Sequence, residues 1–259
     1  MILEGRTVLV TGVGAGLGAE VARLAIRDGA NVVLAARTES VLESTAAELD
    51  PTGERVAWAR TDITDPGDCE ALVGVATQRF GAAHALVQVA AYELAFGGLA
   101  DADLEAWRKA FDTNVLGSYQ LVRAVAPEMK KAGGGSIVLI GSQSMFVPQL
   151  PQAGYAASKG ALLSTMYYLA DELGPDGIRV NMVVPSWMWG PPVQAYLKFE
   201  AKQRGTSEDA LLAEITDRIP LREMAADEDV AEAAVFLASE RARKITGQNL
   251  LVNSGEMMR

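Results

Sequence analysis

The sequence predicts an α/β protein built on one doubly wound parallel sheet of about seven strands, with helices on both faces. Short β-branched runs alternate with longer helical patterns from one end of the chain to the other. Most of these runs are apolar on consecutive residues, which is typical of strands that helices cover on both faces. The regular alternation of strand and helix implies parallel strands joined by right-handed crossovers.

The predicted strands and helices follow one another closely along the chain. Short apolar runs predict strands at Thr7–Thr11, Asn31–Ala36, Arg55–Asp62, His84–Ala91, Ser136–Ser142, Arg179–Pro185 and Asn249–Asn253. Longer patterns between them predict helices at Gly16–Asp28, Glu39–Leu49, Pro66–Arg79, Asp103–Lys131, Ala153–Leu173 and Asp227–Ser239. Because no break in composition marks a second domain, residues 1–259 are expected to form one domain.

Residues 186–220 interrupt this alternation. They begin with tryptophans and prolines and contain two short predicted helices, Val193–Gln203 and Ser207–Asp217. A long excursion from a compact sheet is more often a lid or binding loop than a connector. We therefore expect residues 186–220 to form a substrate-binding loop or lid within the domain.

Composition narrows the classes of function. The chain of 259 residues is 49% hydrophobic and 22% charged, with a net charge of −10, which argues against nucleic-acid and membrane-surface binding. The single cysteine, Cys69, excludes an internal disulfide and fits a reducing, cytoplasmic location. The single histidine, His84, opens a predicted strand without a chemical partner, so we expect a structural role for it and no metal site.

A glycine-rich turn follows the first predicted strand and opens the first helix. It reads Thr-Gly-Val-Gly-Ala-Gly-Leu-Gly over Thr11–Gly18. Glycines there let the backbone turn tightly and approach a pyrophosphate, which the free N–H groups at the helix start bind. The position at the start of a βαβ unit favours this interpretation over glycine for packing alone. The expected dinucleotide contacts are Gly12, Gly14, Ala15, Gly16, Leu17 and Gly18.

The end of the second predicted strand indicates which dinucleotide fits. An acid there would bind the ribose 2′-hydroxyl of NAD, whereas a base would pair with the 2′-phosphate of NADP. The strand ends at Ala36, and Arg37 and Thr38 follow it. Because arginine offers a planar fork suited to phosphate, we expect NADP, with NAD as the alternative. After the third strand, Asp62 and Ile63 are expected beside the adenine, unless Asp62 only stabilises its own turn.

The chain resembles the short-chain dehydrogenase/reductase family, which has the Rossmann fold, over essentially its whole length. The motifs that carry the resemblance are Thr11–Gly18, Asn114 within Asp112–Val115, Ser142 at a strand end, Tyr155-Ala156-Ala157-Ser158-Lys159, Arg179–Pro185 and Ile245–Gln248. The resemblance implies a hydride transfer between a nicotinamide and a secondary alcohol or ketone. It implies a homotetramer or homodimer in which two long helices pair between subunits. The implied catalytic set is Asn114, Ser142, Tyr155 and Lys159, with further cofactor contacts at Ala90, Ala91, Pro185 and Met188.

The tyrosine and lysine of this set are consistent with acid–base chemistry. Tyr155 and Lys159 are four residues apart, which places them on one face of a helix. A free tyrosine has a pKa of about 10. A cation about 4 Å away, at an effective dielectric constant of about 20, stabilises the phenolate by about 4 kcal/mol and so lowers the tyrosine pKa by about three units. By resemblance, Ser142 donates to the same substrate oxygen, and Lys159 also binds the nicotinamide ribose. Asn114 is expected to hold a water that links Lys159 to solvent.

The chain departs from the family pattern near the expected cofactor site. Where the family usually has Asn-Asn-Ala-Gly, Gln88–Ala91 reads Gln-Val-Ala-Ala, so that Val89 cannot tie neighbouring strands together. Pro-Gly after the sixth strand is replaced by Pro185 and Ser186, and the threonine usual after it is missing. A regulatory or scaffold protein that binds the dinucleotide without turnover therefore remains the alternative.

The side chains near the expected site indicate a hydrophobic or cyclic alcohol or ketone as substrate. No fixed cation is expected among them, which disfavours a carboxylate or a sugar phosphate. The expected walls are Tyr92, Phe96, Met145, Phe146, Trp187, Met188 and Trp189, unless some of these pack against a neighbouring subunit.

Overall fold

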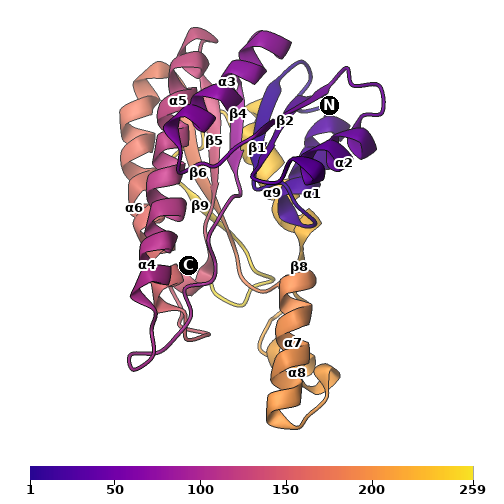
Figure 1. Cartoon of the computed structure of the whole chain (residues 1–259), viewed down its shortest axis with the longest axis vertical. Coiled ribbons are helices and arrows are strands. Elements are labelled where there is room, and N and C mark those ends of the chain that lie inside the picture. The colour runs from indigo at the N-terminus through magenta and orange to yellow at the C-terminus, as the bar shows by residue number, and fades with distance from the viewer. Residues whose placement is uncertain (259) are drawn as a thin grey trace.

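A parallel sheet of seven strands forms the centre of the computed structural model, which describes residues 1–258 (Figure 1). Its strands are β1 (Thr7–Thr11), β2 (Asn31–Ala36), β3 (Val56–Arg60), β4 (Ala85–Gln88), β5 (Gly135–Ile140), β6 (Ile178–Pro185) and β9 (Asn249–Val252). Their order across the sheet is β3-β2-β1-β4-β5-β6-β9, and all neighbours are parallel. The chain therefore winds outward from β1 in one direction and from β4 in the other, which confirms the predicted fold class.

Helices cover both faces of this sheet (Figure 1). One face carries α1 (Leu17–Arg27), α2 (Glu39–Leu49) and α9 (Asp227–Ala238), and the other carries α3 (Pro66–Phe80), α5 (Ser118–Lys131) and α6 (Ala153–Leu173). Alternate residues of β1 feed the two cores, since Val8 and Val10 pack toward the first group and Leu9 toward the second. The central strands are thus apolar on consecutive residues because both of their faces are buried. No helix in residues 1–258 is long and apolar enough to cross a membrane.

The segment predicted as one helix over Asp103–Lys131 has three parts. It consists of α4 (Leu104–Phe111), a π-helical turn (Asp112–Gly117) and α5. A π-turn accommodates an inserted residue within a helix and often lies at a functional site. A Cβ at Gly117 would lie 3.0 Å from Cγ1 of Ile63, so the turn packs closely on the segment after β3. The predicted helical segment is confirmed to within one residue at its start, whereas its π-turn was not predicted, because side-chain periodicity does not reveal one residue inserted for a tertiary contact.

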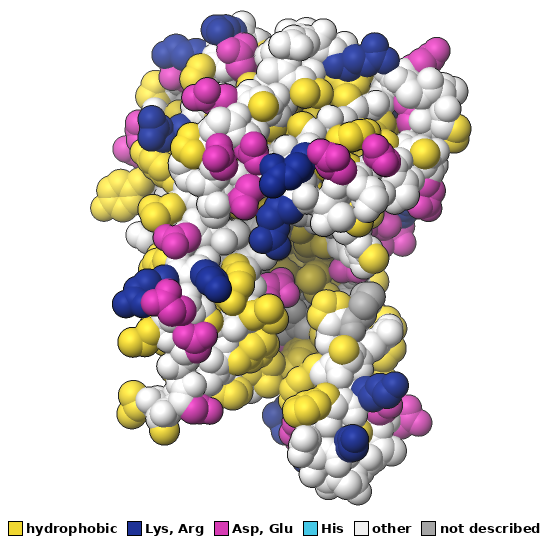
Figure 2. Space-filling view, viewed as in Figure 1, with side chains coloured by type: hydrophobic (Ala, Val, Ile, Leu, Met, Phe, Trp, Pro, Cys, Tyr) yellow, Lys and Arg dark blue, Asp and Glu magenta, His cyan; other side chains and the backbone are white. Residues whose placement is uncertain are grey.

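Residues 186–220 project from the body of the molecule as a small lobe. The lobe contains α7 (Pro191–Arg204) and α8 (Glu208–Thr216), whose own apolar cluster is built on Leu197, Ala201 and Leu211. A two-residue strand, β7 (Met188–Trp189), pairs with β8 (Ala225–Ala226) at the base of the lobe. Figure 2 shows a hollow between the lobe and the body, with hydrophobic side chains along it.

The departure from the family pattern after β4 preserves the tie between strands through another residue. The buried side chain of Gln88 accepts a hydrogen bond from Thr11 Oγ1 on β1 (2.7 Å) and donates one to Ser118 Oγ on α5 (2.6 Å). Thr11 Oγ1 also accepts from the backbone N–H groups of Val89 (3.2 Å) and Ala90 (3.4 Å). Gln88 therefore connects β4 to β1 and α5, which Val89 alone cannot do.

We expect Gln88→Leu to lower the free energy of unfolding by about 1–3 kcal/mol, because it removes the buried acceptor of the Thr11 hydroxyl and the buried donor to the Ser118 hydroxyl. Urea unfolding followed by circular dichroism measures this loss. The control is Gln78→Leu on α3, at an exposed glutamine, with an expected change within about 0.5 kcal/mol. Equal losses in the two variants would contradict the role assigned to Gln88.

Candidate functional site

A cavity of about 1190 Å³ opens at the carboxyl ends of the strands. Ligands of open α/β sheets bind at this edge, and small-molecule pockets usually measure about 300–1,000 Å³, so this cavity has room for a dinucleotide together with a substrate. Each residue expected to bind the cofactor lines it: Gly12, Gly14, Ala15, Gly16, Leu17, Gly18, Arg37, Thr38, Asp62, Ile63, Ala90, Ala91, Tyr155, Lys159, Pro185 and Met188.

The glycine loop has the geometry that a pyrophosphate needs. Gly12 has a φ of +68°, and a Cβ there would lie 2.5 Å from the backbone nitrogen of Ala90. A Cβ at Gly18 would lie 2.4 Å from the carbonyl oxygen of Gly12, whereas at Gly14 it would meet no atom within 4 Å. No side chain caps the start of α1, where Gly16 is the N-cap residue. The N–H groups of its first turn thus remain available to an anion, and the loop fits a dinucleotide.

The end of β2 presents a cation to the same cavity. Arg37 is exposed and forms no ion pair within residues 1–258, whereas Arg60 pairs with Asp68 at 3.1 Å. Asp62 accepts hydrogen bonds from the hydroxyl (2.7 Å) and the backbone N–H (3.0 Å) of Thr64. These bonds, and then the charges of Arg37 and Arg60, hold the pKa of Asp62 below its usual range. Asp62 therefore stabilises its own turn and lines the cavity as well.

Ser142, Tyr155 and Lys159 meet at the other end of the cavity. Ser142 follows β5, and α6 presents Tyr155 and Lys159 from successive turns. Lys159 Nζ lies 5.7 Å from the centre of the Tyr155 ring and donates a hydrogen bond to the carbonyl oxygen of Ile140 (2.7 Å). The two side chains thus lie on one face of α6, toward the cavity. The neighbouring Ser144 lies 2.9 Å from Ser142 between hydroxyl oxygens, but it is not among the lining residues.

The pKa shifts of the side chains at this end of the cavity differ from those expected from the sequence. Lys159 is only 3% exposed, and burial lowers its pKa to about 8, against the opposing effect of Glu93. Burial and the Glu93 charge raise the pKa of Tyr155, while a hydrogen bond from Ser142 lowers it. The ammonium group of Lys159 donates its hydrogen bond to the carbonyl oxygen of Ile140 and not to the phenolic oxygen of Tyr155. Without cofactor, Tyr155 is therefore a protonated acid at neutral pH.

Asn114 has a structural task in the framework of the site, and its role in holding a water stays a prediction. It is buried and does not line the cavity. Its Oδ1 accepts from the backbone N–H of Tyr92 (2.7 Å), and its Nδ2 donates to the carbonyl oxygen of Tyr92 (3.0 Å) and to Ser158 Oγ (2.9 Å). Both protons of its amide group are thus engaged within the protein. The side chain fixes the segment after β4 to the residue that precedes Lys159.

The predicted substrate walls are present only in part. Tyr92, Phe96 and Met188 line the cavity. Four others do not line it. Met145 and Phe146 pack against the core on the face that α3, α5 and α6 cover. Trp187 contacts Tyr196, with 5.5 Å between the ring centres, and Trp189 is 43% exposed. The lobe thus contributes less to the cavity than its tryptophans suggest, because one of them stabilises the lobe itself.

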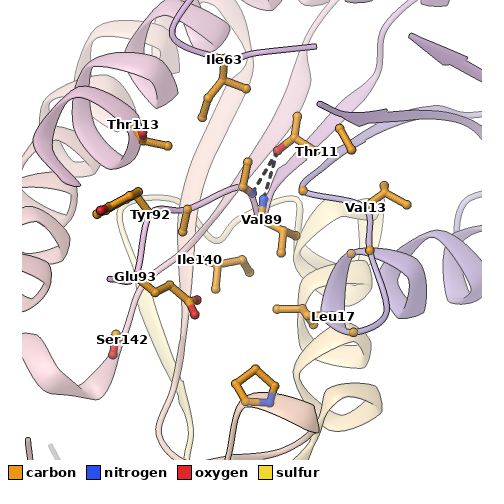
Figure 3. Close-up of a pocket in the computed structure, with 18 of the residues that line it drawn as sticks. Thr11, Val13, Leu17, Ile63, Val89, Tyr92, Glu93, Thr113, Ile140 and Ser142 are labelled. Carbon is orange, nitrogen blue, oxygen red and sulfur yellow. Dashed lines mark hydrogen bonds between the residues drawn. The ribbon is translucent and has the colours of Figure 1, made fainter. Parts of the chain in front are cut away.

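Two acidic residues near the site, Glu93 and Glu256, were not predicted from the sequence. Glu93 lines the cavity, and its carboxylate projects into the middle of it (Figure 3). Its position after β4, at the ligand edge of the sheet, was the available signal. Glu256 accepts hydrogen bonds from Gln143 (2.9 Å), Gln149 (2.6 Å) and Ser186. It connects the C-terminal segment to the loop after Ser142 and to the start of the lobe. No pattern in the sequence predicts such a contact.

His84 has the structural role expected from the sequence. Its Nδ1 accepts a hydrogen bond from the backbone N–H of Thr7 (2.9 Å), and burial lowers its pKa. The neutral ring thus satisfies a backbone donor at the start of β1, away from the cavity.

The lowered pKa of Lys159 predicts a pH dependence of stability in the cofactor-free protein. Between about pH 8 and the ordinary lysine value of 10.5, the unfolded chain holds a proton that the folded chain has lost, so the free energy of unfolding rises with pH. Relative to Lys159→Met, the wild type should gain on the order of 3 kcal/mol across this window, measured by urea unfolding. Parallel pH curves for the two proteins would contradict the lowered pKa.

Known proteins resemble the chain over its whole length. The family model described as "Enoyl-(Acyl carrier protein) reductase" matches residues 12–256. The pig protein "Dehydrogenase/reductase SDR family member 4" is 34% identical over 99% of this chain and 89% of its own length. "L-rhamnose 1-dehydrogenase (NAD(P)(+))" from Sphingomonas is 33% identical over 98% of this chain and 97% of its own.

A solved structure extends the comparison to three dimensions. L-sorbose reductase from Gluconobacter frateurii, complexed with NADPH and L-sorbose, superimposes with a TM-score of 0.92 at 28% identity, over 100% of both chains. The matched model, the identities and the cavity geometry agree on an NAD(P)-dependent oxidoreductase acting on alcohols or carbonyl compounds. The chain belongs to the short-chain dehydrogenase/reductase family.

Proposed function

We propose that the protein interconverts a secondary alcohol and its ketone as a carbonyl reductase, with NADP as the preferred cofactor and Tyr155 as the proton donor and acceptor. One observation carries the proposal: Ser142, Tyr155 and Lys159 line the same cavity as an uncapped glycine loop and Arg37. The alternative of a regulatory or scaffold protein without turnover is disfavoured, since these three side chains are present and Gln88 replaces the missing strand tie.

The chain's own residues supply the acid–base part of this reaction. A nicotinamide, when bound, supplies or accepts the hydride at the carbon that bears the oxygen. In the reductive direction, Tyr155 gives its phenolic proton to that oxygen as negative charge develops there. Ser142 donates a hydrogen bond to the same oxygen and stabilises the charge. The ammonium group of Lys159 adds positive charge nearby and, by resemblance, would hold the nicotinamide ribose.

The preference for NADP rests on Arg37. Its guanidinium lines the cavity at the end of β2, where the adenosine ribose of a dinucleotide would lie, and no acid occupies the strand end. Thr38 adds a hydroxyl donor beside it. Two relatives support the class of cofactor, since one is named for NAD(P)(+) and one was solved with NADPH.

The substrate end of the cavity favours a molecule with an apolar body. Tyr92, Phe96 and Met188 line it, together with Ile140 and Val193. Residues 186–220 would act as the lid over such a substrate, since the hollow of Figure 2 lies between this lobe and the body.

The helices beside the cavity fit assembly into a homodimer or homotetramer. Large apolar side chains remain exposed on the π-turn, α5 and α6: Leu116, Tyr119, Tyr167 and Tyr168. A second copy of the chain would cover them, as the family resemblance implies. A reducing, cytoplasmic location would suit the single buried thiol of Cys69.

We expect Tyr155→Phe to lower kcat by about 10²–10⁴-fold, because the variant has no proton to exchange with the substrate oxygen. The NADP affinity should stay within about threefold, since the phenolic oxygen contributes at most a hydrogen bond to the cofactor. Absorbance of the reduced nicotinamide measures turnover with a panel of ketones, and fluorescence titration measures binding. Unchanged turnover in the variant would overturn the mechanism.

Cofactor choice is tested separately. Arg37→Asp should weaken NADPH binding by about 10–100-fold more than NADH binding, since it replaces a charge-assisted hydrogen bond with repulsion of the 2′-phosphate. Arg60→Asp is the matched control, because Arg60 is already paired with Asp68. Equal losses for both cofactors in Arg37→Asp would remove this residue from the choice.

A further inference from the structure

Glu93 is an acidic residue that lines the same cavity as Tyr155, and the proposed mechanism gives it no role. It lines the cavity with Ser142, Tyr155 and Lys159, and Figure 3 shows its carboxylate directed into the open space between Ser142 and Leu17. Within residues 1–258 the carboxylate has neither an ion pair nor a hydrogen bond. An acceptor-only group that stands free in a cavity is available to a ligand that donates.

The backbone on both sides of Glu93 is held firmly. The side chain of Asn114 binds both the N–H and the carbonyl group of Tyr92, at 2.7 and 3.0 Å. Ala95 is fully buried between Tyr92, Trp107 and Tyr155. The same Asn114 contacts Ser158, which precedes Lys159. The backbone that carries Glu93 is therefore fixed to the same framework that positions Lys159.

The charge of Glu93 reaches the reacting groups. It raises the pKa of Tyr155 and that of Lys159, so its field acts on both. The lining around it includes the apolar side chains of Tyr92, Phe96 and Met188 as well as the polar side chains of Gln152 and Ser186. Glu93 is itself solvent-exposed, so its hydrogen bond to a donor would strengthen when a bound substrate displaces water from the carboxylate.

The surrounding charges select the kind of donor. A substrate carboxylate would be repelled by Glu93. An ammonium group would be attracted by Glu93 but repelled by the nearby ammonium of Lys159 and by the ring of an oxidised nicotinamide. A neutral hydroxyl group escapes both repulsions and still donates a charge-assisted hydrogen bond.

We propose that Glu93 accepts a hydrogen bond from a second hydroxyl group of the substrate, so that the enzyme prefers diols and hydroxyketones to compounds with one oxygen. The inference rests on the proposed function for the identity of the reacting oxygen. The class it names is a molecule with an apolar body, for the walls of the cavity, and two hydroxyl groups, one for Tyr155 and one for Glu93.

The test compares matched alcohols in the wild type, Glu93→Leu and Glu93→Gln. The probes are cyclohexanol, 1,2- and 1,3-cyclohexanediol, and 2- and 3-aminocyclohexanol, each oxidised with NADP or NAD. Each variant is assayed on the plateau of its own pH profile, because loss of the Glu93 charge lowers the pKa of Tyr155 for all substrates. Glu105→Gln is the control, at an exposed acid of α4 that pairs with Arg108.

The wild type should oxidise the better diol with a kcat/KM at least about tenfold above that of cyclohexanol. Glu93→Leu should lower kcat/KM by about 10–100-fold more for the diol than for cyclohexanol, mainly through KM, as expected for one charge-assisted hydrogen bond. Glu93→Gln, which keeps an acceptor oxygen, should fall between them. Equal losses for diol and cyclohexanol, or a preference for an amino alcohol, would overturn the inference.

Calorimetric binding of the diols to the protein–NADP complex separates this inference from the proposed function. Diol binding that depends on Glu93 without any turnover would support the inference and sink the proposed function. Turnover of cyclohexanol without Glu93-dependent diol binding would do the reverse. Absence of both binding and turnover would refute the inference as well.

Discussion

A buried cation at the carboxyl edge of the sheet is the constraint on which the site depends. Lys159 is 3% exposed, and the only hydrogen-bond partner of its ammonium group in residues 1–258 is the carbonyl oxygen of Ile140. Burying an ion without a paired acid costs several kcal/mol, and this cost shifts the group toward its neutral form. The pKa of about 8 is the expression of that penalty. The nearby charge of Glu93 opposes it, so the acid and the lysine need to be considered together.

The framework around this cation explains two irregular features of the fold. The π-turn at Asp112–Gly117 carries Asn114, whose amide joins the segment after β4 to α6. A regular helix would place this amide differently relative to Tyr92 and Ser158, so the inserted residue serves the site. Gln88 makes a similar side-chain connection between β4, β1 and α5. Local irregularity therefore supports a rigid arrangement of the catalytic end.

The sequence predicts the frame of the molecule well and its cavity only partly. The strands β1 and β2 and the helices α2 and α6 have the predicted ends, because periodicity and turn residues are local signals. Every predicted cofactor contact lines one cavity, because motifs at strand ends meet at one edge of a parallel sheet. The orientation of Trp187, the contacts of Asn114 and the bridge made by Glu256 depend on packing between distant segments. No pattern within one segment reports these contacts.

The charges of the site connect its protonation to the direction of the reaction. In the protein alone, burial and Glu93 keep Tyr155 protonated, which is the form needed to reduce a ketone. Oxidation of an alcohol needs the phenolate, and an added positive charge nearby favours that form. An oxidised nicotinamide carries such a charge and a reduced one does not. Under the proposed mechanism, binding of the oxidised cofactor would therefore favour loss of the Tyr155 proton, against the opposing effects of burial and Glu93.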